Sequence, residues 1–124
     1  RRRRHSGRII NLASTSGPVT ACLGDVPYHA AKAGMVGFTR AVALEAAADG
    51  ITVNAIAPGW IATASQLDQE AVAGELTPVK RSGTPDEVAF AVRAFADPQA
   101  SYITGQLLVV DGGNCLPEDR SWTP

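Results

Sequence analysis

A tyrosine and a lysine four positions apart, Tyr28 and Lys32, have the clearest chemical potential in this sequence. On a helix, positions i and i+4 lie on the same face, so both side chains can point into one site. A phenol is a poor acid or base at neutral pH, because its unperturbed pKa is about 10. An ammonium held close favours the phenolate and brings that pKa toward the working range. The pair therefore has the chemistry to move a proton on and off a carbonyl oxygen.

A hydroxyl that could complete such a site belongs to Ser14, which follows an apolar run and precedes Tyr28 by fourteen residues. It would donate a hydrogen bond to the substrate oxygen. Ser16 is an alternative donor for the same contact. A tyrosine–lysine pair alone is a weak signal, since most such pairs on helices are surface residues. The functional interpretation therefore depends on the strands, helices and loops that carry Ser14, Tyr28 and Lys32.

The composition indicates one globular domain. The chain has 124 residues, of which 45% are hydrophobic and 19% charged, and its formal net charge is −1. Length and apolar content are sufficient for a core, and the net charge gives no reason to expect nucleic acid as a partner. The run Arg1–Arg4 could be a nucleic-acid or targeting patch. We favour a solvated helix end, where cations oppose the negative end of the dipole.

Neither a membrane span nor a secretory signal is predicted. No apolar run reaches about 18 residues, and the basic start leads only to a strand-length apolar run. Cys22 and Cys115 lack the spacing and partner ligands of a metal site. We expect a reduced, cytoplasmic protein with two free thiols. Cys22 lies between Ser14 and Tyr28, and we assign it no role.

The first half of the chain reads as a strand followed by a helix. Residues 8–12 form an apolar run, and small polar residues at 13–18 mark a loop at its carboxyl end, where open α/β sheets keep their ligands. An Ala-rich helix is predicted over 28–49, ending at Gly50. A stripe of small residues on it predicts close packing against a strand layer or another helix, with a subunit interface as a further use: Gly34, Gly37 and Ala41.

The second strand is predicted at residues 51–57 and ends at the turn Pro58–Gly59. Residues 60–80 are polar and weakly periodic, with a short helix around 68–75. A loop-rich segment of this length is usually functional, as a lid or binding segment.

The last third contains one helix and one strand. Thr84 and Glu87 form a capping box that starts a helix running to residue 96. The nearly unbroken apolar run at 106–110 is typical of a strand covered on both faces. The order strand, helix, strand, helix, strand predicts right-handed parallel crossovers in a layered α/β sheet. We expect the tail, residues 116–124 with Trp122, to pack on a neighbouring surface.

In these motifs the chain resembles the short-chain dehydrogenase/reductase family, specifically its 3-oxoacyl-acyl-carrier-protein-reductase-like branch. The resemblance runs from Gly7 to about Asn114. Five stretches match in order: the strand ending in the catalytic serine at 7–14, the tyrosine–lysine helix at 28–34, the strand and Pro-Gly turn at the nicotinamide at 51–59, and two C-terminal motifs at 81–89 and 102–113.

The resemblance implies a role for each site residue. Tyr28 would protonate the carbonyl oxygen as hydride arrives, or take the proton during oxidation. Lys32 would lower the Tyr28 pKa and bind the nicotinamide ribose, and Ser14 would hold the substrate oxygen. The Ile61 backbone would meet the carboxamide, and Thr63 would bind near it or the phosphates. The remaining cofactor contacts would come from Pro58 and Gly59, for which an ordinary turn is the alternative.

The resemblance also implies the fold and activity. It predicts the C-terminal portion of a doubly wound, Rossmann-type parallel sheet, with three strands and flanking helices. The activity would be that of an NAD- or NADP-dependent oxidoreductase interconverting a ketone or 3-oxo group and a secondary alcohol. The substrate would be a small molecule or an acyl-carrier carbonyl, and the full-length protein a dimer or tetramer. The turn Asp111–Gly113 would be structural.

The chain departs from the family pattern at its start. The Gly-rich turn for the pyrophosphate, the residue that selects NAD or NADP and the family's relay Asn are absent from this sequence. We expect residues 1–115 to be the C-terminal half of a reductase domain and 116–124 a tail. The segment between Pro58 and Arg81 is a few residues short for the family. Alone, the first strand would have a free apolar edge that invites aggregation.

Two alternatives stay open. The chain could be a non-catalytic interaction or oligomerisation module that uses the 28–49 helix. It could also be one half of a split reductase, completed by a separate N-terminal chain.

Overall fold

The computed structural model describes residues 6–119 and 121. Its centre is a sheet of three parallel strands, whose order follows the sequence: β1 (Gly7–Leu12), β2 (Ile51–Pro58) and β3 (Leu107–Val110). Leu12 lies opposite Ile56 of the central strand, and Ile56 lies opposite Leu108. The predicted parallel α/β sheet is confirmed. Within the described residues, β1 pairs on one side only and is an edge strand.

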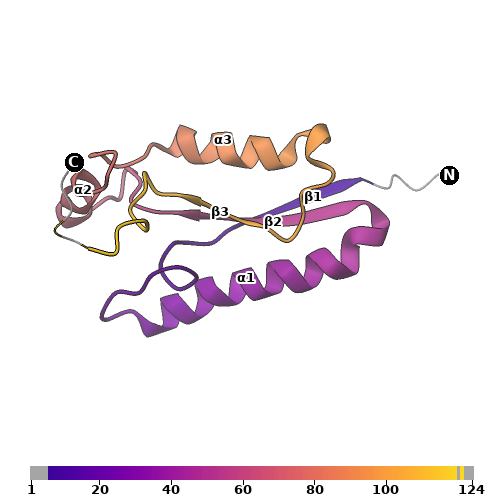
Figure 1. Ribbon diagram of the computed structural model, residues 1–124, viewed down its shortest axis with the longest axis horizontal. Coiled ribbons are helices and arrows are strands. Elements are labelled where there is room, and N and C mark those ends of the chain that lie inside the picture. Colours follow the sequence, from indigo (N-terminus) through magenta and orange to yellow (C-terminus); the bar gives the residue numbers. More distant parts are fainter. Residues whose placement is uncertain (1–5, 120, 122–124) are drawn as a thin grey trace.

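Helices cover both faces of this sheet (Figure 1). The long helix α1 (Val26–Ala46) lies along one face, and α3 (Pro85–Ala96) lies along the other. The short helix α2 (Asp68–Glu75) lies beyond the carboxyl ends of the strands. Two 3₁₀ turns, η1 (Ala47–Asp49) and η2 (Pro98–Ala100), lead out of the long helices. The layers are those of a Rossmann-type fold, as predicted.

The core lies between α3 and the sheet. Ile56, Ala91 and Phe95 are buried together, and partly buried side chains pack around them: Ile10, Val88, Val92 and Val110. The predicted capping box starts α3. The Glu87 N–H donates to Thr84 Oγ1 at 3.2 Å, and the Thr84 N–H donates to Glu87 Oε1 at 3.0 Å. The helix is thereby held at its first turn, on the side of the sheet that carries the core.

The predicted boundaries of α1 need one correction. The helix begins at Val26, two residues before Tyr28. Pro27 lies in its first turn, where a missing N–H costs no hydrogen bond, so the chain can enter the helix early. Its far end was predicted correctly. The helical path continues through η1 and ends at Gly50, whose φ of +70° lies in the left-handed region.

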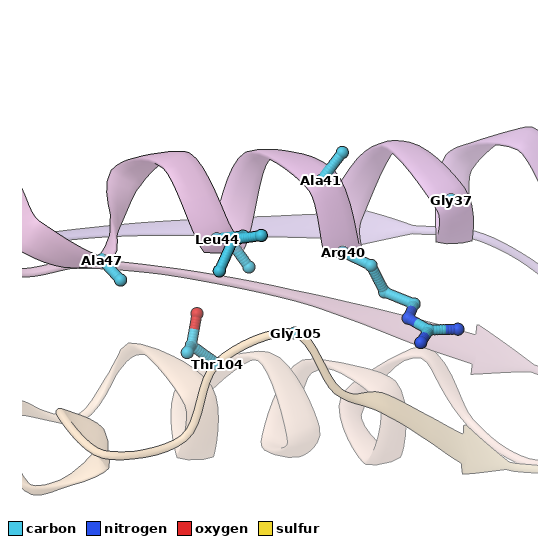
Figure 2. Close-up of a pocket in the computed structure, with 8 residues that line it drawn as sticks. Gly37, Arg40, Ala41, Leu44, Ala47, Thr104 and Gly105 are labelled. Carbon is cyan, nitrogen blue, oxygen red and sulfur yellow. The ribbon is translucent and has the colours of Figure 1, made fainter.

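The small-residue stripe of α1 does not pack against the sheet, so that prediction is wrong for the described chain. A Cβ built on Gly34 or Gly37 meets no atom within 4 Å, and the buried residues of α1 are Thr39 and Ala43. Figure 2 shows α1 with Gly37 and Ala41 above the loop that enters β3. Between them lies a groove of about 660 Å³, lined by Gly37, Arg40, Ala41, Ala43, Leu44, Ala47, Thr104 and Gly105.

Among the described residues, no helix has the length and apolar character needed to cross a bilayer. The Arg1–Arg4 run and Trp122, for which the sequence suggested a helix end and a packed tail, lie outside the described residues.

Candidate active site

A cavity of about 630 Å³ opens where the chain leaves β1 and β2. Its walls come from the loop after β1, the first turn of α1 and the segment after β2. The lining residues are Ser14, Thr15, Ser16, Cys22, Leu23, Asp25, Tyr28, Gly59, Trp60, Ile61, Thr63, Ser65, Gln69 and Glu70. The carboxyl edge of a parallel sheet is where α/β folds bind ligands, and this cavity lies there.

The loop that carries Ser14 continues the pairing of β1 with β2. The Ala13 N–H donates to the Ile56 carbonyl at 2.8 Å, and the Thr15 N–H donates to the Pro58 carbonyl at 3.2 Å. Ser14 lies between these two anchors and is only 9% exposed. Its Oγ accepts a hydrogen bond from the Ser16 N–H at 3.1 Å. Because Oγ is the acceptor in that bond, the hydroxyl keeps its own proton to donate to an oxygen in the cavity.

The same loop lies close against the first turns of α1. Gly17 has a φ of +102°, and a Cβ built on it would lie 2.5 Å from the His29 carbonyl oxygen. Only glycine fits this position, because a side chain meets both an unfavourable backbone conformation and the helix backbone. The glycine therefore lets the Ser14 loop approach the helix that carries Tyr28.

Tyr28 and Lys32 lie one turn apart on α1, and their contact is direct. Lys32 Nζ lies over the Tyr28 ring, 5.6 Å from its centroid. The same Nζ donates a hydrogen bond to the Leu12 carbonyl at 3.1 Å, which ties the ammonium to the end of β1. Tyr28 lines the cavity and is 41% exposed, so its phenol is accessible to a ligand. Lys32 does not line the cavity itself.

A second contact fixes the start of the helix. The Cys22 N–H donates to His29 Nε2 at 2.9 Å, and His29 Nδ1 lies 2.6 Å from the Asp25 carbonyl oxygen. These partners assign the imidazole proton to Nδ1. Cys22 Sγ lies 3.8 Å from His29 Nε2 and borders the cavity. The sequence indicated that Cys22 could lie near the site only because Cys22 falls between Ser14 and Tyr28.

The expected cofactor residues fall at the start of the segment after β2. Gly59, Ile61 and Thr63 line the cavity. Pro58 does not, but its carbonyl accepts the hydrogen bond that holds the Ser14 loop. Thr63 Oγ1 lies 3.3 Å from Ser65 Oγ. The structure thus brings five of the seven expected site residues to one cavity, while Lys32 contacts the Tyr28 ring and Pro58 anchors the loop that carries Ser14.

The sequence indicated residues 60–80 as a lid or binding segment, but it did not single out the residues that form the opposite wall of the cavity. Trp60, Gln69 and Glu70 border the cavity, as do Leu23 and Asp25 before α1. The charged lining side chains are both acidic, Asp25 and Glu70, and Glu70 Oε2 accepts a hydrogen bond from the Leu67 N–H at 2.7 Å. The polar, loop-rich character of residues 60–80 was the available signal for this wall. Within residues 6–119 and 121, no group of three His, Cys, Asp or Glu side chains could hold a metal ion.

Comparison with known proteins identifies the family. Residues 1–114 match the family model described as enoyl-(acyl carrier protein) reductase. A 3-oxoacyl-[acyl-carrier-protein] reductase from Synechocystis is 50% identical over 111 residues, which cover 87% of this chain and 44% of that protein. The chain spans slightly less than half the length of the curated relatives that it matches.

Solved structures agree with the sequence match. An acetoin dehydrogenase from Enterobacter cloacae superposes with a TM-score of 0.83 at 36% identity, covering 98% of this chain and 48% of that one. The acetoin dehydrogenase YohF from Salmonella typhimurium gives a TM-score of 0.79 at 38% identity, covering 91% and 45%. With the family model matched over almost the whole chain and the fold shared, this chain belongs to the short-chain dehydrogenase/reductase family.

Proposed function

We propose that the protein containing this chain is an NAD(P)-dependent oxidoreductase that interconverts a ketone or 3-oxo group and a secondary alcohol. One observation carries the proposal. Ser14 and Tyr28 line the same cavity, and the Lys32 ammonium lies 5.6 Å from the centroid of the Tyr28 ring. These are the donor, the proton carrier and the cation that carbonyl reduction requires. The relatives described as a 3-oxoacyl reductase and as acetoin dehydrogenases support the same chemistry.

Tyr28 is the general acid of the proposed reduction and the general base of the reverse oxidation. Its phenol donates a proton to the carbonyl oxygen as negative charge develops there. Lys32 supports this role through its charge, because a nearby cation stabilises the phenolate left behind. One of its N–H groups is used by the Leu12 carbonyl, which holds the ammonium in place and leaves two donors for other partners.

Ser14 holds the substrate oxygen. Its Oγ accepts a hydrogen bond from the Ser16 N–H, which holds the oxygen in place while its own proton is donated to the substrate. A preorganised donor at the position where charge develops lowers the barrier without reorganising during the reaction. Ser16 lines the cavity as well, but its backbone already serves to fix Ser14.

The residues after β2 fit a nicotinamide. No atom of residues 6–119 or 121 accepts a hydrogen bond from the Ile61 N–H, and Ile61 borders the cavity. An unsatisfied backbone donor at a ligand site suits the carboxamide oxygen. Thr63 would bind beside it, the turn Pro58–Gly59 would face the ring, and Lys32 and Tyr28 would meet the ribose. When bound, NAD or NADP supplies or accepts the hydride.

The substrate of the proposed enzyme is a small-molecule or acyl-carrier carbonyl compound. The full-length protein would act in the cytoplasm as a homo-oligomer, a dimer or a tetramer, without a nucleic acid or membrane partner.

The test is Tyr28→Phe in the full-length protein, assayed with acetoin and with a 3-oxoacyl thioester. Loss of the general acid should lower kcat by about 10²- to 10⁴-fold while cofactor binding is retained. Tyr102→Phe is the matched control, because Tyr102 is 100% exposed and does not border the cavity. Turnover by Tyr28→Phe at the wild-type rate would refute the assignment.

A second candidate function is an interaction module. The observation that favours it is the open face of α1, where Leu44 is 83% exposed and Phe38 58% exposed beside the small residues. A sample that self-associates but binds neither NAD nor NADP would support this alternative, and Leu44→Glu should then abolish the association. Binding of either cofactor by the full-length protein would count against it.

A further inference from the structure

The segment that walls the cavity, residues 60–80, contacts the turn after β3 at its two ends. Between these ends it is held against the chain just before α3, where the Ala62 N–H donates to the Gly83 carbonyl at 2.8 Å and Gln66 Nε2 donates to Ser82 Oγ at 3.0 Å. We call it the wall segment. It leaves the sheet at Gly59, and it returns at Val79 and Lys80 before α3 begins. Both ends meet the same short turn, Asp111–Gly113, which follows β3. The sequence suggested only a structural turn there.

The first end is held at Gly59. Its N–H donates to the Val110 carbonyl at 2.9 Å. A Cβ built on Gly59 would lie 2.7 Å from Asp111 Cβ, closer than side chains approach, so the two backbones touch. This close approach holds the residue that precedes Trp60, and the Trp60 carbonyl accepts a hydrogen bond from the Gly83 N–H at 2.9 Å.

The second end is held at Val79. Its N–H donates to the Gly112 carbonyl at 3.2 Å. A Cβ on Gly112 would lie 3.2 Å from Val79 Cβ, and one on Gly113 would lie 3.3 Å from Pro78 Cγ. Beneath this contact Thr77 is 4% exposed, and its Oγ1 both accepts from the Lys80 N–H at 3.2 Å and donates to the Arg81 carbonyl at 3.3 Å. The turn and the returning chain are therefore tightly packed.

The turn is itself held by the Asp111 carboxylate. Oδ1 accepts from the Gly113 N–H at 2.9 Å, and Oδ2 accepts from the Cys115 N–H at 2.9 Å. Hydrogen bonds to a carboxylate are stronger than neutral ones, so this side chain defines the turn conformation. Gly112 and Gly113 have φ values of +62° and +82°, which the turn requires and which few other residues adopt.

Trp60 connects this turn to the catalytic cavity. It lines a small pocket of about 110 Å³ together with Val79, Asp111 and Gly112, and it also lines the large cavity together with Ser14 and Tyr28. A shift of the turn would therefore move a residue that a ligand touches.

We propose that the turn Asp111–Gly113 clamps both ends of the wall segment and thereby sets the position of Trp60 in the cavity, which makes Asp111 and Gly112 positioning residues for the substrate. The clamp follows from the contacts alone. Its consequence for a substrate rests on the proposed function.

Hydrogen–deuterium exchange of the full-length protein tests the clamp without reference to activity. Asp111→Ala removes both acceptors of the turn, and the amides of the wall segment, residues 60–80, should exchange roughly ten- to a hundredfold faster. Gly112→Ala pushes on Val79 instead, and it should accelerate exchange in the same segment. Asp97→Ala is the matched control, because Asp97 Oδ1 also caps a turn, accepting from the Gln99 N–H at 2.8 Å, but at η2.

Wild-type exchange of the wall segment in both Asp111→Ala and Gly112→Ala would overturn the clamp, as would equal acceleration in Asp97→Ala. Gly112→Ala decides the question if Asp111→Ala does not fold. In the oxidoreductase assay, the clamp variants should raise KM more than they lower kcat, because Tyr28, Lys32 and Ser14 stay in place. If every variant and the wild type lack activity, the proposed function fails while the exchange result still decides the clamp.

Discussion

The Lys32 ammonium lies between two groups: the Tyr28 ring, with its centroid 5.6 Å away, and the Leu12 carbonyl, which accepts a hydrogen bond at 3.1 Å. The lysine therefore joins the helix that carries the tyrosine to the strand that leads into Ser14. Lys32 therefore supplies the positive charge beside Tyr28 and also holds α1 against the end of β1. Altering this one side chain should change both the charge and the geometry of the proposed site.

Lys32→Met is expected to lower kcat/KM by roughly 10²-fold, because the phenolate of Tyr28 loses its stabilising cation. Methionine keeps much of the apolar stem, so the fold should survive. Arg40→Met is the matched control, since Arg40 is an exposed cation on the same helix that faces the other groove. Steady-state kinetics of the full-length protein would measure both variants. Equal losses in the two variants would mean that helix charge in general, rather than the Tyr28 contact, matters.

Gly17→Ala is expected to destabilise the fold by roughly 2–4 kcal/mol, because it combines backbone strain with a clash against the His29 carbonyl. Gly24→Ala isolates the strain. Gly24 has a φ of +88°, but a Cβ there meets nothing within 4 Å, so about 1 kcal/mol is expected. Chemical denaturation of the two variants measures the difference. Similar losses would mean that the Ser14 loop moves away from α1 at little cost.

The sequence predicted the elements that local chemistry determines. The end of the helical path through α1 and η1 at Gly50 depends on a left-handed residue, and the start of α3 after Thr84 depends on a capping box. Both can be read from neighbouring residues. That Ser14 and Tyr28 share one cavity could also be predicted from the sequence, because it depends on the order of the motifs and on helix spacing.

What the sequence could not provide depends on contacts between distant segments. Residues 60–80 contain no pattern that predicts Trp60 as a wall of the cavity, since its position depends on Asp111, fifty-one residues further on. The hydrogen bond from Asn11 Nδ2 to Thr39 Oγ1, at 2.9 Å, is equally hidden, although it ties β1 to α1 at a side chain that is 1% exposed. A stripe of small residues on a helix does not predict burial either, because the same residues can lie on a packed face or on a solvent-exposed one, as Gly34 and Gly37 do.

Acid should weaken the structure through Glu87. Two hydrogen bonds join its carboxylate to the Arg81 guanidinium, at 2.7 and 3.0 Å, and that contact first, followed by the Thr84 N–H, lowers the pKa of Glu87 from 4.5 to about 2. Because the folded-state pKa is depressed, the contribution to stability is complete above the ordinary value of 4.5 and is lost as pH falls toward 2.

Glu87→Gln should therefore be less stable than the wild type at neutral pH, and the difference should shrink between pH 4.5 and about 2. Denaturant titrations at several pH values measure it. Glu75→Gln serves as control, because Glu75 is exposed and forms no ion pair within the described residues. A pH-independent difference for Glu87→Gln would show that the Arg81 contact is not formed in solution.

Two of the glycines inside helices, Gly34 and Gly74, predict opposite effects of the same substitution. Gly34 of α1 faces open space, so Gly34→Ala should raise the free energy of unfolding by about 0.5–1 kcal/mol, the gain in helix propensity. Gly74 of α2 is buried against Ser82, whose N atom would lie 2.8 Å from an added Cβ. Gly74→Ala should lower that free energy, because the backbone at Ser82 must shift. Urea denaturation of both variants in the full-length protein compares them directly. If Gly34→Ala is destabilising and reduces the oligomer size in sedimentation, a second copy of the chain covers this face of α1, and the open surface around Gly34 is an interface in solution.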